Sequence, residues 1–168
     1  MIIAGRRRER LEELKAEILK DLPSSKIHVQ ILDVRDVEAC MALPTQLPAD
    51  FSDVAVLVNN AGLALGVSTV DTNDLGQAEN MLATNVLGLM AMCRAFAPGM
   101  KQREEGHIIN IGSIAGHFPY ASGSAYNASK FAVTGFTAAA RHDLLNSPVR
   151  VTHVSPGLVG NTEFSNVR

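Results

Sequence analysis

The stretch VAVLVNNAG, residues 54–62, decides the fold class that the sequence predicts. Its first five residues are all apolar, which is typical of a short strand buried on both faces of a parallel sheet. Two asparagines, an alanine and a glycine follow at once, where such a strand ends. Because ligands of open α/β sheets bind outside the carboxyl ends of the strands, this end marks the edge of a site.

Apolar runs of similar character alternate with helical patterns along the rest of the chain. We expect the other strands at residues 1–4, 26–34, 107–111 and 150–154. We expect helices at residues 11–22, 36–47, 74–103 and 124–146, the second of them cut by Pro44 and Pro48. This alternation predicts an α/β fold with an open parallel sheet, helices on both faces, and one domain over residues 1–168.

The composition describes a folded protein without a strong overall charge. Of 168 residues, 46% are hydrophobic, which is enough for one domain with a sizeable core. The 15 basic and 17 acidic residues leave a net charge of −2, so the whole-protein charge favours neither nucleic acid nor an anionic membrane. No run approaches the roughly 18 apolar residues of a membrane span, and residues 1–5 are too short for a signal peptide. We therefore expect a cytoplasmic protein.

The cysteines and histidines indicate neither a disulfide framework nor a metal centre. Cys40 and Cys93 each lie in an apolar helical stretch, which is typical of reduced, packed thiols. The five histidines have no spacing suited to a shared metal ion, and the cysteines do not supplement them. We therefore predict that the protein binds no metal.

The clearest chemical signal is SAYNASK, residues 124–130, at the start of a helical pattern. Tyr126 and Lys130 are four residues apart, so one face of the helix carries both polar groups. A free phenol has a pKa near ~10 and is a poor acid or base at neutral pH unless a cation stabilises its phenolate. Lys130 supplies that charge, which suits Tyr126 to proton transfer with an alcohol oxygen. The alternative is an exposed helix with an incidental pair, because a lone Tyr-x-x-x-Lys often occurs by chance.

Several motifs follow one another along the chain and together resemble one family. NNAG at 59–62, NVLG at 85–88, INIGS ending at Ser113, YNASK at 126–130 and PG at 156–157 are similar to the successive motifs of the short-chain dehydrogenase/reductase superfamily. The stretches LVGNTEFSNVR, NAGLALG and HIINIGSIAG resemble more narrowly its NADP-dependent 3-hydroxy acid and serine dehydrogenase branch. The resemblance covers essentially all 168 residues and implies a Rossmann-like doubly wound parallel sheet that binds NADP.

The resemblance implies catalytic roles for four residues. Tyr126 would be the general acid or base, exchanging a proton with the substrate oxygen while a hydride passes to or from the nicotinamide. Lys130 would lower the pKa of Tyr126 and hydrogen-bond the nicotinamide ribose. Ser113 would hold the substrate carbonyl or hydroxyl, because a hydroxyl can donate to an oxygen that gains charge. Asn85 would anchor a water that links Lys130 to solvent.

The resemblance also implies a set of cofactor contacts along the carboxyl ends of the strands. The residues expected to lie along the cofactor are Asn59, Ala61 and Gly62, with Asp33 facing the adenine. The residues expected at the carboxamide and neighbouring groups are Pro156, Gly157, Val159 and Thr162.

Arginines directly after the first strand are expected to select NADP over NAD. Arg6 and Arg7 would clamp a 2′-phosphate, since guanidinium groups match phosphate geometry and no acidic residue ends that strand. The alternative is that these arginines are only the solvated first turn of the next helix, although cations are unfavourable at a helix N-terminus.

The implied reaction interconverts a small 3-hydroxy acid, or a similar alcohol, and its keto or aldehyde form. One alternative is a carbonyl reductase of the same family with another substrate. Another is a non-catalytic member that only associates through helices 74–103 and 124–146, through which family members form dimers, so we expect a homo-oligomer. A hydrolase triad of Ser113, His142 and Asp143 is a poor rival, because adjacent residues diverge on a helix.

Two parts of the family pattern are absent from the sequence. The first strand with its TGxxxGxG turn does not precede Met1, and the last helix and strand do not follow Arg168. In the family strand order 3-2-1-4-5-6-7 the first strand is central, between the strands at 1–4 and 54–58. Its absence leaves two apolar edges with unpaired backbone groups, which must pair with each other, with another chain, or not at all. We therefore expect a fragment or a truncated gene product.

Overall fold

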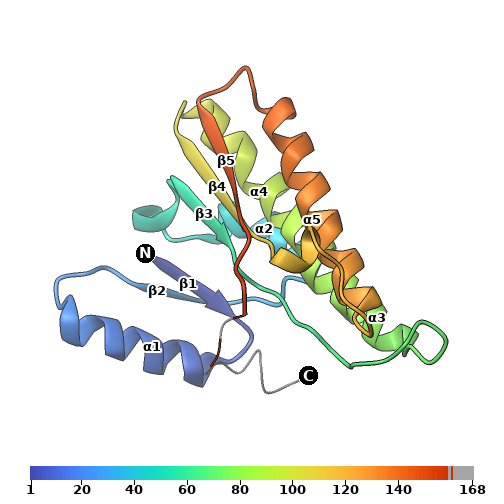
Figure 1. Cartoon of the computed structure of the whole chain (residues 1–168). Helices are drawn as coiled ribbons and strands as arrows, with labels where there is room; N and C mark the ends of the chain where they lie inside the picture. The colour runs from blue at the N-terminus through green and yellow to red at the C-terminus, as the bar shows by residue number, and fades with distance from the viewer. Residues whose placement is uncertain (159, 161–168) are drawn as a thin grey trace.

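The computed structural model describes residues 1–158 and residue 160. In this part of the chain, five short strands form two separate sheets (Figure 1). The first sheet pairs β1 (Ile2–Gly5) with β2 (His28–Ile31). The second contains β3 (Val56–Asn59), β4 (Gly106–Ile111) and β5 (Val149–Val154), in the order β3-β4-β5. Every pairing is parallel, which confirms the predicted α/β class.

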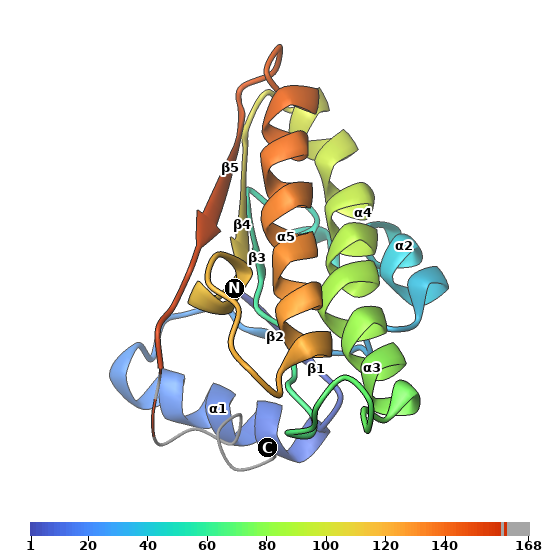
Figure 2. The same ribbon diagram turned by 45° about the vertical axis from the view of Figure 1, so that its right-hand side comes forward.

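Helices follow the strands in the predicted alternation. They are α1 (Arg8–Asp21), α2 (Val37–Gln46), α3 (Leu75–Leu82), α4 (Leu89–Gln102) and α5 (Ser124–Asp143). A π-helical turn, Ala83–Gly88, joins α3 to α4, and short 3-10 turns occupy Ala49–Phe51 and Ile114–Gly116. Figure 2 shows the β3-β4-β5 sheet almost edge-on, with α2, α4 and α5 on one side of it. Helix α1 packs on the β1-β2 pair.

Strand β3 is buried on one face, not on both as the sequence suggested. Leu57 and Asn59 are 7% exposed and face the helix layer, whereas Val56 and Val58 are 54% and 52% exposed. The reason is that α4 covers one face of β3, while no helix within residues 1–158 packs on the other. The apolar run therefore predicted the strand correctly, but only one of its two faces is buried.

Helix α2 continues through Pro44, where the sequence predicted a break. Asp36 caps its start, since the Asp36 side chain accepts a hydrogen bond from the Ala39 amide at 2.9 Å. Proline removes one backbone donor from a helix, but Cys40 and Leu43 are buried against α4 and hold this helix in place. The helix ends only before Pro48, at the C-cap Leu47.

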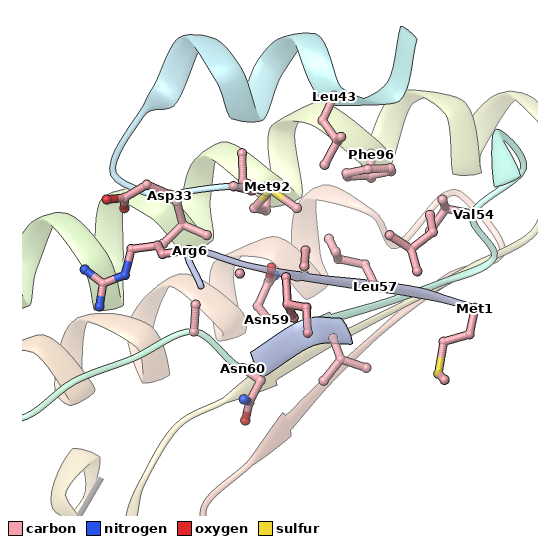
Figure 3. A pocket seen from close by; sticks show the side chains of 18 of the residues that line it. Met1, Arg6, Asp33, Leu43, Val54, Leu57, Asn59, Asn60, Met92 and Phe96 are labelled. Atoms are coloured by element: carbon pink, nitrogen blue, oxygen red, sulfur yellow. The ribbon is translucent and has the colours of Figure 1, made fainter. Parts of the chain in front are cut away.

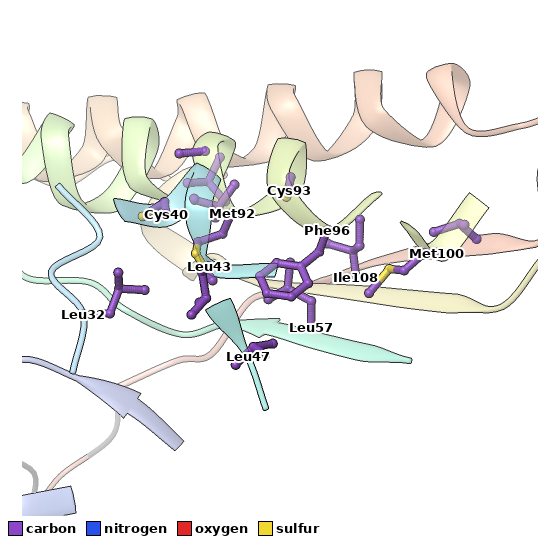
Figure 4. Packing of buried hydrophobic residues seen from close by; sticks show 14 residues of the cluster. Leu32, Cys40, Leu43, Leu47, Leu57, Met92, Cys93, Phe96, Met100 and Ile108 are labelled. Carbon is purple, nitrogen blue, oxygen red and sulfur yellow. The ribbon is translucent and has the colours of Figure 1, made fainter. Parts of the chain in front are cut away.

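The central helix, from α3 through α4, supplies much of the core. Leu57 and Ile108 of the sheet pack with Leu43, Phe96 and Met100 of the helices in one apolar cluster (Figure 4). The continuous helix Leu75–Gln102 also has the length and hydropathy of a membrane span, with a mean hydropathy of 1.3 over its most apolar window. Half of that window is buried inside the protein, as a core helix requires.

Candidate active site

Helix α5 brings Tyr126 and Lys130 together at the carboxyl end of the β3-β4-β5 sheet. The alanine-rich sequence favours a helix, and its four-residue spacing stacks the two side chains one turn apart. Both are buried, at 7% and 5% exposure, and the Lys130 ammonium lies 5.8 Å from the centroid of the Tyr126 ring. Lys130 Nζ also donates to the Ile111 carbonyl at 3.0 Å, which fixes the lysine against the end of β4. The pair is therefore not an incidental feature of an exposed helix surface.

The buried surroundings of Lys130 disfavour the charged form of its side chain. Burial away from water lowers the pKa of the ammonium from 10.5 to about 8. The ammonium is still mostly protonated at pH 7. It has three N–H donors and uses one on Ile111, so others can serve a ligand.

Asn85 lies in the π-helical turn and is held by the loop after β3. Its side-chain oxygen accepts from the Leu63 amide at 2.8 Å, and its Nδ2 donates to the Leu63 carbonyl at 2.8 Å and to Ser129 Oγ at 3.0 Å. These three bonds tie the β3 loop, the central helix and α5 together. A water on Asn85, which the resemblance implies, would share this side chain with its protein partners.

Gly62 is the point where these elements converge. A Cβ placed on Gly62 would lie 3.4 Å from Asn85 Oδ1 and 3.7 Å from Lys130 Nζ. The glycine thus keeps the space above Lys130 open, and its own backbone lies at the edge of the site. The loop predicted from NNAG and the lysine predicted from YNASK are neighbours in space.

Ser113 follows β4 directly and caps the 3-10 turn Ile114–Gly116. Its Oγ accepts a hydrogen bond from the Ala115 amide at 3.1 Å, and the side chain is half-buried. Oγ acts here as an acceptor, so its O–H can still donate to a ligand. The Ile114 amide donates to the Pro156 carbonyl at 3.1 Å, which places the turn after β5 beside Ser113. Gly157 follows in that turn, whereas Val159 and Thr162 lie outside the described residues.

The other predicted cofactor residues line one large cavity of about 930 Å³ between the two sheets (Figure 3). The predicted residues in its wall are Arg6, Arg7, Asp33, Asn59, Ala61 and Gly62. Figure 3 shows Arg6 beside Asp33 at one end of this cavity. Tyr126, Lys130 and Ser113 are not in its wall, so Gly62 connects the cavity to the Tyr126 end of the site.

Asp33 is held by an arginine that the sequence analysis missed. Arg35 Nε donates to both carboxylate oxygens of Asp33 at 3.0 Å, and Arg35 Nη1 donates to Asn80 of α3 at 3.0 Å. These hydrogen bonds lower the pKa of the Asp33 carboxyl, with a further contribution from the charge of Arg6. The end of β2 is therefore clamped to the central helix. The spacing Asp-x-Arg was the only sign of this clamp in the sequence.

Asn59 lies in the cavity wall, and its side-chain amide nitrogen is engaged by partners in the interior. Its Nδ2 donates to Asn110 Oδ1 at 2.9 Å and contacts Cys93 Sγ at 3.2 Å, and Asn110 Nδ2 donates to Thr137 Oγ1 at 3.0 Å. This buried network joins β3, β4, α4 and α5.

A family model described as short chain dehydrogenase matches residues 1–168. The chain belongs to the short-chain dehydrogenase family. That membership accounts for the order of the motifs along the chain and for the convergence of three of them at Gly62.

The similar curated proteins of this family are longer than the chain. The NADP-dependent 3-hydroxy acid dehydrogenase YdfG of Escherichia coli (strain K12) is 48% identical over 168 residues, which are 100% of this chain and 66% of that protein. The NADP-dependent 3-hydroxy acid dehydrogenase of Schizosaccharomyces pombe is 42% identical over 172 residues, covering 100% of this chain and 64% of that protein. The chain therefore spans slightly less than two-thirds of the length of these relatives.

Solved short-chain dehydrogenases have the same fold. The closed form of a serine dehydrogenase complexed with NADP+ superposes with a TM-score of 0.91 and 48% identity, covering 99% of this chain and 65% of that one. Serine dehydrogenase from Escherichia coli gives a TM-score of 0.88 with 46% identity, covering 95% and 71%. The Rossmann-like fold expected from the resemblance is thereby confirmed.

Several residues that shape the short-chain dehydrogenase site gave little sequence signal. Ser129 and Asn110 lie inside the quoted motifs YNASK and INIGS, but no role was predicted for either, and Thr137 lies outside every motif; all three hold the site through buried hydrogen bonds. The alternation of strand residues also places Asn110 on the inner face of β4.

Proposed function

We propose that this chain carries the active site of an NADP-dependent oxidoreductase. The reaction interconverts a small 3-hydroxy acid and its keto or aldehyde form by hydride transfer. The observation that best supports this proposal is that Gly62, Asn85 and Lys130 lie close together beside the buried Tyr126. Such an arrangement places a proton-transfer group, a cation and an open backbone edge at the same point.

Tyr126 is the proposed acid and base. In the oxidative direction the carbinol carbon gives up a hydride, and its hydroxyl proton passes to the Tyr126 oxygen, so that a carbonyl remains. In the reverse direction Tyr126 returns the proton to the carbonyl oxygen. Its burial and its fixed place on α5 favour a constant distance to the reacting oxygen.

Ser113 orients the substrate in this proposal. Its O–H can donate to the substrate oxygen, while the Ala115 amide holds Oγ in place. The hydrogen bond between Ile114 and Pro156 keeps this turn beside the end of β5. Ser113 therefore fixes the oxygen that exchanges a proton with Tyr126.

Lys130 stabilises negative charge on the Tyr126 side and binds the cofactor ribose in this proposal. Its ammonium lies next to Gly62, where a Cβ would be 3.7 Å from Nζ, and the donors not used on Ile111 can serve the ribose. Asn85 keeps the loop of Gly62 at this distance through its two bonds to Leu63. Asn85 thus keeps the Gly62 loop beside Lys130.

NADP is the proposed cofactor, and its nicotinamide accepts or supplies the hydride when bound. The names of the two curated relatives and the NADP+ complex of the similar serine dehydrogenase support this choice. In this chain, Arg6 and Arg7 would meet the 2′-phosphate at the end of β1, and Asp33 and Arg35 would border the adenine. The expected contacts of Val159 and Thr162 with the carboxamide and neighbouring groups of the cofactor are part of the same proposal.

The proposed substrate class follows the relatives, which are named for 3-hydroxy acids and for serine. Serine is itself a 3-hydroxy acid with an added amino group, so one pocket can serve both. We also propose that the chain forms a homo-oligomer through the central helix and α5, where Leu82, Leu87 and Phe131 are exposed apolar side chains. Its two free, buried cysteines suit a reducing compartment such as the cytoplasm.

Replacement of the proposed acid and base provides the direct test. Tyr126→Phe should lower kcat for L-serine or 3-hydroxybutyrate with NADP+ by roughly 10²–10⁴-fold, because it removes the proton acceptor and little else. Cofactor affinity should stay unchanged. Tyr120→Phe is the matched control and should keep wild-type turnover. Equal turnover in Tyr126→Phe and wild type would remove Tyr126 from the mechanism.

A further inference from the structure

The end of β5 carries a histidine on its inner face. Val149 and Val151 of β5 belong to the apolar core, so His153, the next alternate residue, points to the same face, which α5 covers (Figure 2). The outer face of β5 is marked by Thr152, whose Oγ1 lies 2.8 Å from His107 Nε2. His153 is half-buried, and its Nε2 atom is buried. The imidazole of His153 therefore lies between the sheet and α5.

Gly112 leaves the space that this imidazole fills. On β4, Ile108 and Asn110 are buried residues of the inner face, and Gly112 is the next alternate position. A Cβ on Gly112 would lie 2.8 Å from both Cδ2 and Cε1 of His153, and closer still to Nε2. The His153 ring thus stands where any other residue would carry its side chain. It packs against the backbone that leads directly into Ser113.

The turn around Ser113, residues 112–117, is bonded to residues 154–156, which directly follow His153. Three hydrogen bonds join the two segments. They run from the Gly112 amide to the Val154 carbonyl at 2.7 Å, from the Ile114 amide to the Pro156 carbonyl at 3.1 Å, and between His117 Nε2 and Ser155 Oγ at 2.9 Å. A movement of His153 is therefore passed to the Ser113 turn both through the contact with Gly112 and through these bonds.

The groups that act on His153 within the described residues are cations or can become cations. The His117 ring lies 5.6 Å from the His153 ring, centroid to centroid, and Arg141 and Lys130 act on it from α5. Burial and then these charges lower the pKa of the His153 imidazole from 6.5. Nε2 has no hydrogen-bond partner among the described residues. The folded protein consequently favours the neutral imidazole, and an added proton would place an unpaired charge against Gly112.

We propose that the neutral imidazole of His153 is a positioning residue for Ser113, and that a proton on His153 displaces the Ser113 turn. The inference rests on the proposed function, in which Ser113 orients the substrate oxygen for Tyr126. A charged imidazole leaves Gly112 to reach water, because an unpaired charge is unfavourable in a buried position. Residues 154–156 move with it and draw the turn away. Acid therefore reduces substrate orientation while Tyr126 stays in place.

The ionisation of His153 can be followed without cofactor or substrate. In the ¹⁵N-labelled full chain, long-range imidazole spectra give the titration of each histidine ring, and the amide shifts of Ser113 and Ile114 report the position of the turn. Both amides should change with the midpoint of His153, below pH 6.5. Amide shifts that stay constant through the titration of His153 would overturn the proposal.

Two glutamine variants separate His153 from its neighbour. His153→Gln removes the ionisation and keeps a polar group at the end of the side chain, so the Ser113 and Ile114 amides should no longer titrate. His117→Gln is the matched control: the amides should still titrate, with a higher midpoint, because the charge of His117 lowers the His153 pKa. Loss of the titration in His117→Gln and its persistence in His153→Gln would overturn the proposal. The wild-type titration decides the question even where a variant folds poorly.

The reductive direction of the proposed reaction separates His153 from the catalytic residues. With acetoacetate and NADPH, Tyr126 must hold its proton and Lys130 its charge, so acid removes neither from the reaction. Between about pH 5 and 8, wild-type kcat/KM should nevertheless fall below the His153 midpoint, by up to about tenfold per pH unit. His153→Gln should lack this fall. His28→Gln, which replaces a histidine of β2, should retain it.

The outcomes distinguish this inference from the proposed function. Turnover that is absent at every pH would contradict the proposed function, and the amide titration would still test the role of His153. An equal fall of kcat/KM in His153→Gln and in the wild-type protein would overturn that role.

Discussion

At the scale of single residues, the buried ammonium of Lys130 links stability to pH. Its pKa in the folded protein is about 8, below the 10.5 of an exposed lysine, because burial disfavours the charged form. The unfolded chain therefore binds more protons between these two values, so the contribution of Lys130 to the free energy of unfolding rises with pH from about 8 to about 10.5. Below pH 8 the full desolvation penalty is present.

Lys130→Met should consequently stabilise the protein at pH 7 by about 1–3 kcal/mol, because it removes a buried charge and keeps an unbranched side chain. The gain should vanish as the pH approaches 10.5. Urea denaturation at several pH values measures both effects. Lys101→Met, at an exposed position, is the control and should show neither. A Lys130→Met protein with no gain at pH 7 would mean that water reaches the ammonium.

The pKa of the Asp33 carboxyl depends on Arg35, and a titration can test this dependence. The Arg35 guanidinium donates to both oxygens of Asp33 and holds the pKa of that carboxyl below its usual value. Arg35→Ala should therefore raise the Asp33 pKa toward that of an exposed aspartate, as measured by carboxyl ¹³C shifts against pH. Arg103→Ala, which removes the partner of Asp53, should leave the Asp33 titration in place. An unchanged Asp33 titration in Arg35→Ala would assign the shift to Arg6.

At the scale of elements, the central helix approaches Val34, in the segment after β2, too closely for a side chain at Gly88. A Cβ there would lie 2.7 Å from the Val34 carbonyl oxygen, which is a backbone atom and cannot rotate away. Gly88→Ala should lower the free energy of unfolding by about 1–3 kcal/mol through this overlap. Gly135→Ala is the matched control: nothing lies within 4 Å of that Cβ on α5, and the change should stabilise by about 0.5–1 kcal/mol. Thermal unfolding compares the two variants, and similar losses in both would contradict the close approach.

Elements were predicted well wherever a local pattern determined them. Every expected strand and helix is present within residues 1–158, with shifts of a few residues at the ends. The break expected at Pro44 was wrong because burial of Cys40 and Leu43 outweighs one lost backbone bond. Tertiary packing of this kind has no local signature, and the same holds for the clamp of Arg35 on Asp33.

At the scale of the whole molecule, the sequence predicted two apolar sheet edges without a partner, and the structure contains them as the walls of one cavity. The edges do not pair with each other among the described residues, which removes one of the three expected outcomes. Tyr126, Lys130, Asn85 and Gly62, which come from three separate motifs, lie close together in the structure, and their roles stay a prediction. The interior partners of the Asn59 side chain were not predictable, since Asn110 and Cys93 come from distant segments.

A fluorescence titration of the purified chain with NADPH, with NADH as the comparison, tests the central claim most directly. We predict saturable binding that favours NADPH, because Arg6 and Arg7 stand in the cavity wall at the end of β1. The double replacement Arg6→Ala with Arg7→Ala should weaken NADPH binding far more than NADH binding. Equal affinity for the two cofactors, or equal losses in the variant, would contradict the proposed recognition of the 2′-phosphate by Arg6 and Arg7. Absence of any binding would contradict a dinucleotide site in this chain.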